Sequence, residues 1–289
     1  MNNMLSRRQM LARTAQATAA IALSQTLSPL LAAPASRGFK IGACDWSLGR
    51  NDPSCMKIAH EIGLDGVQVS MGSAGDHMKM RQPEVRQAYL KAAKENNVEV
   101  ASLALSETNS VPLFSEPRAA IWLLDGIEVC RALNVKVVLI ACFGTGELRA
   151  DDKPSMDRVT ELLKEIAPRA EKAGVILGLE NYMSAEANLG IIDRVGSPAV
   201  QVYYDVGNST DKGYDILKEI RLLGKRICEF HAKDADHMLG QGRIDFKQVR
   251  AAMDDIDYRG WIQIEAAAPH SIVQDYRADL NYLRGIFPA

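Results

Sequence analysis

Four side chains in the second half of the chain are of the types that bind metal ions, and their spacing is regular. They are Glu180, Asp205, His231 and Glu265, separated by 25, 26 and 34 residues. Each stands at the end of a short strand-like run rich in apolar residues. A (β/α)8 barrel contains about eight strand-plus-helix units in roughly 250 residues, and the C-terminal ends of its strands all face one pocket. The spacing therefore predicts that these four ligands, scattered in sequence, converge in space.

Three carboxylates and one imidazole form a ligand set dominated by oxygen. This set suits one hard divalent cation, with Mn²⁺ as our first expectation and Mg²⁺, Co²⁺ or Zn²⁺ as alternatives, whereas structural zinc prefers thiolates and histidines. Taken singly, an acidic residue after a strand more often caps a helix, and a lone histidine is more often a core residue. The joint pattern favours a metal site because four successive strand-like runs end in ligand-type residues.

Short β-rich runs alternate with helical patterns along the chain, which is typical of repeated βα units and a parallel sheet. The predicted strands are Lys40–Asp45, Gly66–Ser70, Glu99–Leu105, Lys136–Ala141, Val175–Glu180, Gln201–Asp205, Ile227–His231 and Trp261–Glu265. The predicted helices are Pro53–Ile62, Pro83–Asn96, Pro117–Leu133, Pro154–Ala173, Tyr214–Leu223 and Ile272–Gly285, with Gly63, Gly174 and Gly224 as stops. Eight strands favour a single (β/α)8 TIM barrel over a doubly wound open sheet.

Composition excludes some classes of function. The chain has 289 residues, of which 47% are hydrophobic, and a formal net charge of −2, as expected for a soluble globular protein. The balanced charge provides no basic face for nucleic acid. The five cysteines are odd in number and show no paired spacing, so we expect buried, reduced thiols, although one disulfide after export is the alternative.

The N-terminal 35 residues have the order of features of a twin-arginine export signal. Ser6–Leu11 contains the arginine pair, Thr14–Ala35 is uncharged and rich in Ala and Leu, and Ala33-Pro34-Ala35 is a small-x-small cleavage pattern. The alternatives are a disordered or amphipathic tail and an uncleaved membrane anchor, which the polar residues of this stretch disfavour. We therefore predict a signal peptide at 1–35, a barrel domain at 36–289, contact with the twin-arginine export machinery, and a periplasmic or exported location.

Several motifs of the chain carry a family resemblance. They are Ala59–Val67, Gly178–Asn181, Asp205–Asn208, His231–Asp234, Gly240–Phe246 and Ile264–Glu265. With these motifs the chain resembles the xylose-isomerase-like barrel superfamily of sugar isomerases and epimerases, which also contains endonuclease IV. The resemblance extends from about Phe39 to Phe287, and it implies that Glu180, Asp205, His231 and Glu265 bind one divalent metal.

The resemblance also implies a reaction. In the ketose epimerases of this family, residues matching Glu180 and Glu265 flank the substrate carbon, and one removes a proton that the other can return on the opposite face. A metal-stabilised enediolate formed next to a carbonyl would be the intermediate. Because phosphosugars are mostly cytoplasmic, export favours a non-phosphorylated sugar, keto-sugar or polyol. Gln68, where many relatives have glutamate, and Asn208, where ketose epimerases tend to have histidine, argue against an ordinary free ketose.

Further residues are candidates for contact with a carbohydrate. Each has an alternative role: a solvent-exposed loop residue for Arg243, a structural pair with Asp234 for Lys233, helix capping for Asn181 and Asn208, and simple packing for Trp46. The candidate substrate-binding residues are Trp46, Gln68, Glu107, Asn181, Asn208, Lys233, His237 and Arg243.

Three other functions compete with a sugar isomerase or epimerase. A keto-glycoside lyase or hydratase would use the same metal enolate to expel a leaving group. A nuclease similar to endonuclease IV is disfavoured, because that enzyme type uses three metals and several histidines, and this chain has only five. Both candidate glutamates are present, which speaks against a non-catalytic sugar-binding barrel. A homo-oligomer remains an open alternative.

Overall fold

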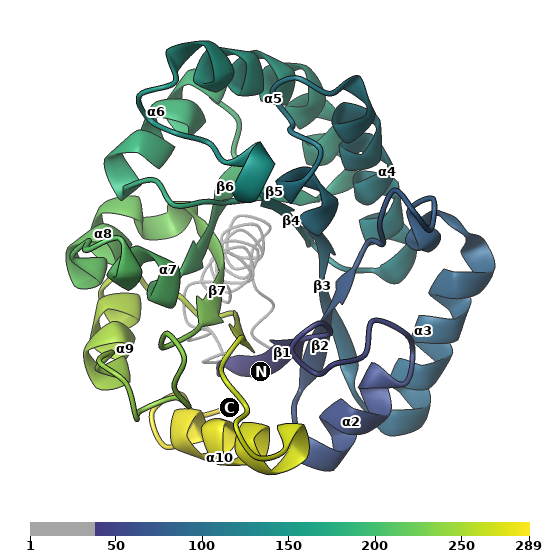
Figure 1. Cartoon of the computed structure of the whole chain (residues 1–289), viewed down its shortest axis with the longest axis vertical. Helices are drawn as coiled ribbons and strands as arrows, with labels where there is room; N and C mark the ends of the chain where they lie inside the picture. The colour runs from purple at the N-terminus through teal and green to yellow at the C-terminus, as the bar shows by residue number, and fades with distance from the viewer. Residues whose placement is uncertain (1–37) are drawn as a thin grey trace, which may run out of the picture. The chain divides into compact units, whose positions relative to one another are not determined.

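Eight parallel strands close into a barrel in the order of the chain (Figure 1). The computed structural model describes residues 38–289, so the predicted signal peptide and its boundary at residue 35 lie outside the described residues. The strands are β1 (Lys40–Cys44), β2 (Gly66–Ser70), β3 (Glu99–Leu105), β4 (Val137–Ala141), β5 (Ile176–Glu180), β6 (Val200–Asp205), β7 (Ile227–Ala232) and β8 (Trp261–Ile264). The predicted (β/α)8 TIM barrel is confirmed, and every predicted strand is present within one residue at either end.

Helices surround the strands as a ring (Figure 1). They are α2 (Cys55–Ile62), α3 (Pro83–Asn96), α4 (Pro117–Leu133), α5 (Lys153–Ala173), α6 (Ala185–Val195), α7 (Val206–Asp211), α8 (Ile216–Leu223), α9 (Phe246–Asp255) and α10 (Ile272–Arg284). Short 3₁₀ turns lie at Lys79–Arg81, Ser106–Asn109, Gly144–Gly146 and Gly224–Arg226. We did not predict α6, α7 or α9, which begin directly after polar caps.

Local side-chain contacts explain two helix starts that differ from the prediction. Pro53 is not the first helical residue, because the Asp52 carboxylate accepts the Ser54 backbone N–H at 2.8 Å and forms a turn before α2. Helix α8 begins after Asp215, whose side chain accepts the Lys218 N–H at 3.1 Å. The stop at Gly63 is confirmed, with a left-handed φ of 98° that a glycine adopts without strain.

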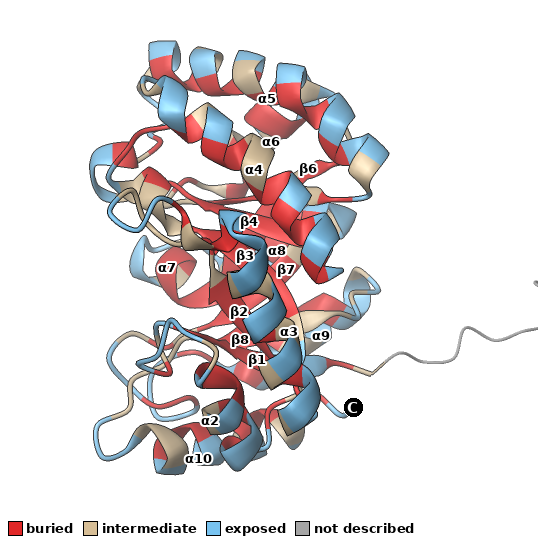
Figure 2. Ribbon diagram, turned by 90° about the vertical axis from the view of Figure 1, so that its right-hand side faces the viewer, coloured by how far each residue is buried: buried red, intermediate tan, exposed pale blue. Residues whose placement is uncertain are grey.

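The apolar core has two parts. The larger part lies between the sheet and the helices, where the inner helix faces are buried and the outer faces exposed (Figure 2). The smaller part contains no helix residue, and its buried members are Ala104, Val137, Leu139, Ala141 and Tyr203. Parallel strands buried on both faces explain the nearly continuous apolar runs of the sequence. The barrel interior is nevertheless polar near β7 and β8, where Glu229 and Gln263 are buried.

The cysteines bear on one prediction made from the sequence. All five cysteines are free in the structure, four of them buried, as expected for reduced thiols. Within residues 38–289, no helix combines the length and the apolar character needed to cross a bilayer.

Asp279 of α10 fastens the loop that follows β7. The side chain is 1% exposed, and Oδ1 accepts the backbone N–H of Leu239 at 2.9 Å. Oδ2 is buried without a hydrogen-bond partner. Burial raises the pKa of Asp279 to about 7, against the Leu239 hydrogen bond and with a smaller contribution from Asp275.

We expect Asp279 to make the protein less stable as the pH rises from about 4 to about 8. The unfolded pKa is about 3.9, so in this window the folded state binds the additional proton. The stabilisation that this proton gives the folded state is complete below the unfolded pKa, and it is lost as the pH rises through the folded pKa of about 7. Since one pKa unit corresponds to about 1.4 kcal/mol, half of the shift would change the free energy of unfolding by about 2 kcal/mol.

Asp279→Asn stays neutral and keeps an acceptor for Leu239, so it should flatten this part of the pH dependence. Urea unfolding of both proteins in EDTA, at several pH values, measures the effect. Parallel stability curves for the two proteins would contradict the prediction.

Candidate metal centre

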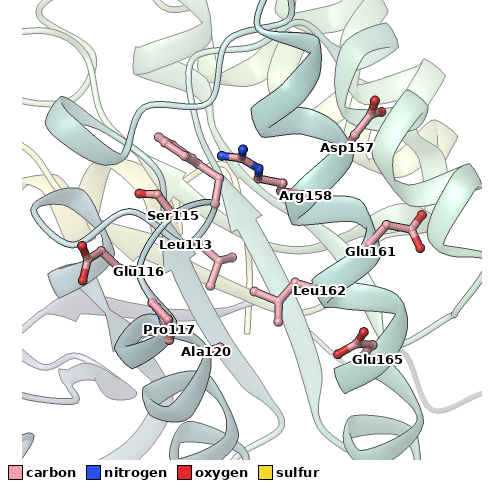
Figure 3. Close-up of a pocket in the computed structure, with 11 residues that line it drawn as sticks. Leu113, Ser115, Glu116, Pro117, Ala120, Asp157, Arg158, Glu161, Leu162 and Glu165 are labelled. Atoms are coloured by element: carbon pink, nitrogen blue, oxygen red, sulfur yellow. The ribbon is translucent and has the colours of Figure 1, made fainter.

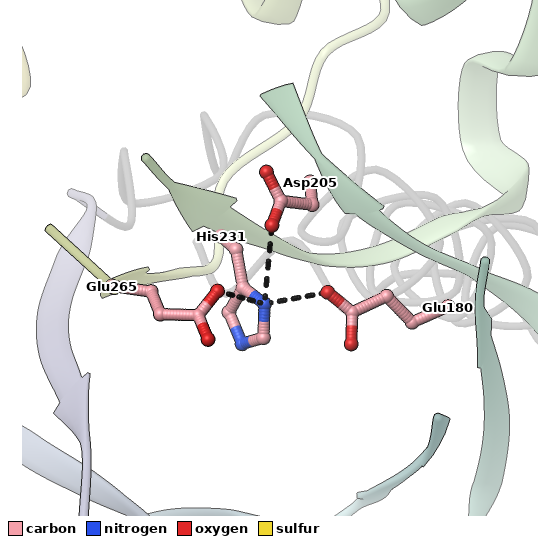
Figure 4. A group of neighbouring side chains, drawn as sticks. All are labelled: Glu180, Asp205, His231 and Glu265. Atoms are coloured by element: carbon pink, nitrogen blue, oxygen red, sulfur yellow. Dashed lines mark hydrogen bonds and ion pairs between the residues drawn. The ribbon is translucent and has the colours of Figure 1, made fainter. Parts of the chain in front are cut away.

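The four predicted ligands converge at the C-terminal end of the barrel. Glu180 ends β5, Asp205 ends β6, His231 lies in β7, and Glu265 directly follows β8. One ligand atom of each residue lies within 4.8 Å of the others. Figure 4 shows all four side chains pointing toward one another. The prediction that residues spread over the second half of the chain meet in one place is confirmed.

His231 Nδ1 is at the centre of the group. It lies 2.8 Å from Glu180 Oε1, 3.6 Å from Glu265 Oε2 and 3.9 Å from Asp205 Oδ2 (Figure 4). The register of the sheet explains part of this geometry, because Asp205 and His231 are paired residues of neighbouring strands. The imidazole is 1% exposed, so its other nitrogen must find a partner inside the barrel.

Asp205 uses its two carboxylate oxygens differently. Oδ1 accepts the backbone N–H groups of Gly207 at 2.7 Å and Asn208 at 2.9 Å, which caps α7. Oδ2 is buried, faces the other ligands and has no hydrogen-bond partner. A buried carboxylate oxygen without a partner is costly unless a cation neutralises it. The cap fixes the side chain, and the second oxygen is left available as a ligand.

The electrostatics of the group favour a cation. Burial, and then the charges of Glu265 and Glu180, raise the pKa of Asp205 well above its usual range. Three carboxylates in so small a buried volume repel one another unless positive charge lies between them. The convergent oxygens, the histidine nitrogen and the unpartnered Asp205 oxygen fit one divalent cation, which is the ligand set that hard metals prefer.

Glu265 is held by two further side chains. The indole N–H of Trp46 donates to Oε1 at 2.9 Å, and Lys233 Nζ donates to Oε2 at 3.3 Å. Burial opposes ionisation of Glu265, but the positive charges of His231 and Lys233 and the Trp46 hydrogen bond lower its pKa. Trp46 and Lys233, two candidate substrate residues, therefore both belong to the site, where each contacts a ligand carboxylate.

Gln68, a candidate substrate-binding residue, contacts the predicted ligand His231 in the structure. It is completely buried in the barrel below His231, with an exposure of 0%. Its Oε1 lies 2.9 Å from His231 Nε2, and its Nε2 donates to Ser102 Oγ at 3.2 Å. Gln68 lies on β2 two residues before its end and joins the site through His231.

Asn181 and Glu107 use their side chains within the protein. Asn181 Oδ1 accepts the Met183 N–H at 2.9 Å, and its amide donates to Asn188, which fixes the loop after β5. Glu107 Oε1 accepts the Ala74 N–H at 3.1 Å. Asn181 does not cap α6, the alternative considered from the sequence, because Ser184 is the N-cap of that helix.

The remaining candidates lie farther from the centre of the group or at its edge. Asn208 is a buried residue at the start of α7, and its backbone N–H contacts Asp205. Arg243 is exposed and paired with Asp211. His237 is exposed in the loop after β7, and its backbone N–H contacts Asp234. None of these three side chains contacts the four ligands in the structure.

A buried polar group that was not predicted from the sequence lies beneath His231. Ser102 Oγ and Tyr203 OH each lie 2.9 Å from the same oxygen of Glu229. Burial raises the pKa of Glu229 to about 7, although the hydrogen bonds with Ser102 and Tyr203 lower it. Glu229 precedes His231 by two residues, so both side chains point to the same side of β7. This period of two was the available sequence signal.

A groove on the outer surface is separate from this site. It lies between the start of α4 and α5 and is lined by Leu113, Phe114, Pro117 and Leu162 beside several acidic side chains (Figure 3). No predicted site residue lines it. The chemistry predicted from the sequence therefore belongs to the mouth of the barrel.

A sequence profile described as "Xylose isomerase-like TIM barrel" matches residues 56–286. The 2-epi-5-epi-valiolone 7-phosphate 2-epimerase of Actinoplanes sp. is 26% identical over 178 residues, which cover 61% of this chain and 65% of that enzyme. An L-ribulose-5-phosphate 3-epimerase of Salmonella heidelberg is 26% identical over 230 residues, covering 73% of this chain and 80% of that enzyme.

Among solved structures, a D-psicose 3-epimerase studied in the presence of D-fructose has a similar fold. Its TM-score is 0.72 at 16% sequence identity, and the alignment covers 87% of this chain and 100% of that one. All three of these proteins are named as epimerases. At this identity the structural similarity shows the fold alone.

We expect Asp205→Asn to separate the two roles of this residue. The amide keeps an oxygen for the α7 cap but removes one of the crowded charges, so the metal-free protein should become more stable, by at least about 1 kcal/mol, because one pKa unit corresponds to about 1.4 kcal/mol. Mn²⁺ affinity should fall by at least about 10-fold, because an amide is a weaker ligand than a carboxylate. Urea unfolding in EDTA and calorimetric Mn²⁺ titration measure the two effects. Unchanged Mn²⁺ affinity would argue against Asp205 as a ligand.

Proposed function

The chain belongs to the xylose isomerase-like TIM barrel family, and from this premise we propose that it is a divalent-metal-dependent sugar epimerase or isomerase. One observation supports this proposal above all. Glu180 and Glu265 approach the ligand group from opposite sides (Figure 4), on strands that are well separated around the barrel. A substrate carbon placed between them would have a carboxylate on each face, which is what inversion by proton transfer requires.

Glu180, Asp205, His231 and Glu265 would hold the metal. When bound, a divalent cation supplies Lewis acidity, which acidifies the hydrogen next to a carbonyl. The chain's own groups perform the proton transfers. One glutamate removes the hydrogen from the carbon, and the other donates a proton to the opposite face. Because both carboxylates are fixed by hydrogen bonds, little reorganisation is needed during the reaction.

The two glutamates differ in how many of their carboxylate oxygens are hydrogen-bonded, so we assign them different roles in proton transfer. Both oxygens of Glu265 are engaged, by Trp46 and by Lys233. Glu180 contacts His231 through Oε1 only, among the side-chain hydrogen bonds of the described residues. We assign Lys233 the role of a positioning residue that keeps Glu265 ionised and correctly oriented. The aromatic pair Phe143 and Tyr182, with ring centroids 4.6 Å apart, would provide an apolar wall for a sugar ring.

We propose a non-phosphorylated sugar, keto-sugar or polyol as the substrate. Both candidate phosphate contacts already have acidic partners, since Arg243 pairs with Asp211 and Lys233 with Glu265. A phosphate would have to share these cations with the carboxylates. The two relatives compared by sequence are named for phosphorylated substrates, so phosphorylated and free sugars should be assayed side by side.

Solvent deuterium exchange tests the reaction before the product is known. The Mn²⁺-loaded protein is incubated in D₂O with free ketoses, keto-sugars, inososes and their phosphorylated counterparts. Deuterium at a carbon next to a carbonyl, with formation of the epimer or isomer, is expected for one class of free sugar. Release of a leaving group would instead indicate a keto-glycoside lyase, and exchange with phosphosugars alone would contradict the proposed substrate class.

Glu180→Gln and Glu265→Gln should each reduce exchange by about 10³-fold, because general acid–base catalysis contributes roughly 10² to 10⁴ to the rate. Bound Mn²⁺ is quantified in both variants, so that loss of metal is distinguished from loss of a base. Glu186→Gln, an exposed change on α6, serves as the matched control and should retain wild-type exchange. Full exchange in either site variant at full metal occupancy would exclude that residue as a catalytic residue.

We also propose that the protein is exported through the twin-arginine pathway. This proposal rests on the sequence of the first 35 residues, which lie outside the described part of the chain. Replacing the pair with Arg7→Lys and Arg8→Lys together should retain the protein in the cytoplasm, because the paired guanidinium groups define the signal. Arg13→Lys is the control. Fractionation of cells that express each variant gives the readout, and equal export of both variants would contradict the proposal.

A further inference from the structure

A continuous line of hydrogen bonds runs from the candidate metal centre into the barrel. His231 Nε2 lies 2.9 Å from Gln68 Oε1, and Gln68 Nε2 donates to Ser102 Oγ at 3.2 Å. Ser102 Oγ donates to Glu229 Oε2 at 2.9 Å. Every one of these side chains is at most 2% exposed. Strands β2, β3 and β7 contribute these side chains, and β6 adds Tyr203, which also bonds to Glu229.

The direction of each hydrogen bond follows from the carboxylate. In its ionised form, which the hydrogen bonds from Ser102 and Tyr203 favour, the Glu229 carboxylate only accepts hydrogen bonds, and its Oε2 receives both hydroxyls. The Ser102 hydroxyl has a single hydrogen, which it gives to Glu229, so it must accept from its other neighbour. Gln68 therefore turns its NH₂ group toward Ser102 and its oxygen toward His231. His231 must then carry a hydrogen on Nε2.

This orientation determines which imidazole nitrogen can bind a metal. With hydrogen on Nε2, the neutral ring has its lone pair on Nδ1, the nitrogen that faces Glu180 at 2.8 Å. With the Gln68 amide reversed, its NH₂ group would face Nε2 and favour hydrogen on Nδ1, which blocks the ligand position. The hydrogen bond made by the other nitrogen commonly fixes the metal-binding tautomer of a histidine.

We propose that Glu229, acting through Ser102 and Gln68, sets the tautomer of His231 and thereby the affinity of the site for its divalent metal. The ring of Tyr203 packs against the imidazole at a centroid distance of 4.5 Å, a contact that does not depend on its hydroxyl. Gln68, Ser102 and Glu229 are positioning residues. None contacts the ligand carboxylates directly in the structure.

Gln68 is well suited to this role because its uncharged amide has one donor end and one acceptor end. The donor bond to Ser102 therefore fixes the acceptor toward His231. Its oxygen also faces the buried thiol of Cys44 at 3.4 Å, so two weakly acidic groups can donate to it. A leucine at this position would leave the Nε2 hydrogen of His231 with only the weak acceptor Cys44 Sγ, at 3.5 Å. It would also remove the Gln68 donor to Ser102, whose hydroxyl keeps Glu229 as its acceptor. A glutamate would keep an acceptor facing His231.

The inference rests on the metal site of the proposed function, but not on epimerisation. We therefore test it by NMR and by metal binding. Protein with ¹⁵N-labelled histidine is recorded metal-free and with Zn²⁺, which is diamagnetic, and Mn²⁺ affinity is measured by calorimetry. We expect a slowly exchanging Nε2–H signal of His231 in the wild-type protein in both states.

Gln68→Leu should abolish this signal and weaken Mn²⁺ binding by about 10- to 100-fold, the effect typical of losing a partner of a metal-bound histidine. Gln68→Glu should retain the signal and most of the affinity. Ser102→Ala frees the amide to rotate and should also weaken binding. Tyr203→Phe removes a hydrogen bond from the same carboxylate but leaves the line from Glu229 to His231 intact, so it should keep both readouts.

Retention of the Nε2–H signal and of Mn²⁺ affinity in Gln68→Leu would overturn the proposal. Equal losses in Ser102→Ala and Tyr203→Phe would also overturn it, because they would indicate general destabilisation of the barrel interior. If Gln68→Leu does not fold, the comparison of Ser102→Ala with Tyr203→Phe decides the question by itself. A protein without activity on any sugar can still give either result, so failure of this inference is separable from failure of the proposed function.

Discussion

The mutual repulsion of three carboxylates around one imidazole is the constraint on which the rest of this structure depends. Barrel closure brings Glu180, Asp205 and Glu265 together with His231, and all of these except the partly exposed Glu265 are buried. Like charges at such separations are unfavourable in a medium of low polarity. The neighbouring groups reduce this repulsion. Backbone N–H groups of α7 bind Asp205, the Lys233 ammonium and the Trp46 indole N–H bind Glu265, and the His231 imidazole lies between the carboxylates.

The positions of the ligands could be predicted from the sequence because barrel topology converts spacing into proximity. One strand-plus-helix unit separates Glu180, Asp205 and His231, and strand ends meet at one mouth whatever the details of the helices. The short helix α7 was not predictable in this way, because it begins on the residue after Asp205 without an intervening loop. Its start depends on a carboxylate that the sequence had already assigned to the metal.

The environment of Gln68 could not be predicted, because it depends on contacts between strands that are distant in sequence. The ring of His231 reaches it from β7, 163 residues away, and Ser102 reaches it from β3. Periodicity shows that Gln68 alternates with apolar neighbours, but it does not distinguish the mouth of a barrel from its interior. For Trp46 the sequence correctly indicated the mouth, while its partner Glu265 emerges only from the pairing of β1 with β8.

The hydrogen bond between Trp46 and Glu265 spans the seam of the barrel, where the first and last strands meet. Its two residues are 219 positions apart, so the contact cannot form while the C-terminal part of the chain is still being synthesised. One proposed base is thus oriented only after the final strand has docked. A truncated or partly translated chain would hold most of the ligands and lack the carboxylate that completes them. Docking of β8 against β1 is therefore what completes the ligand group.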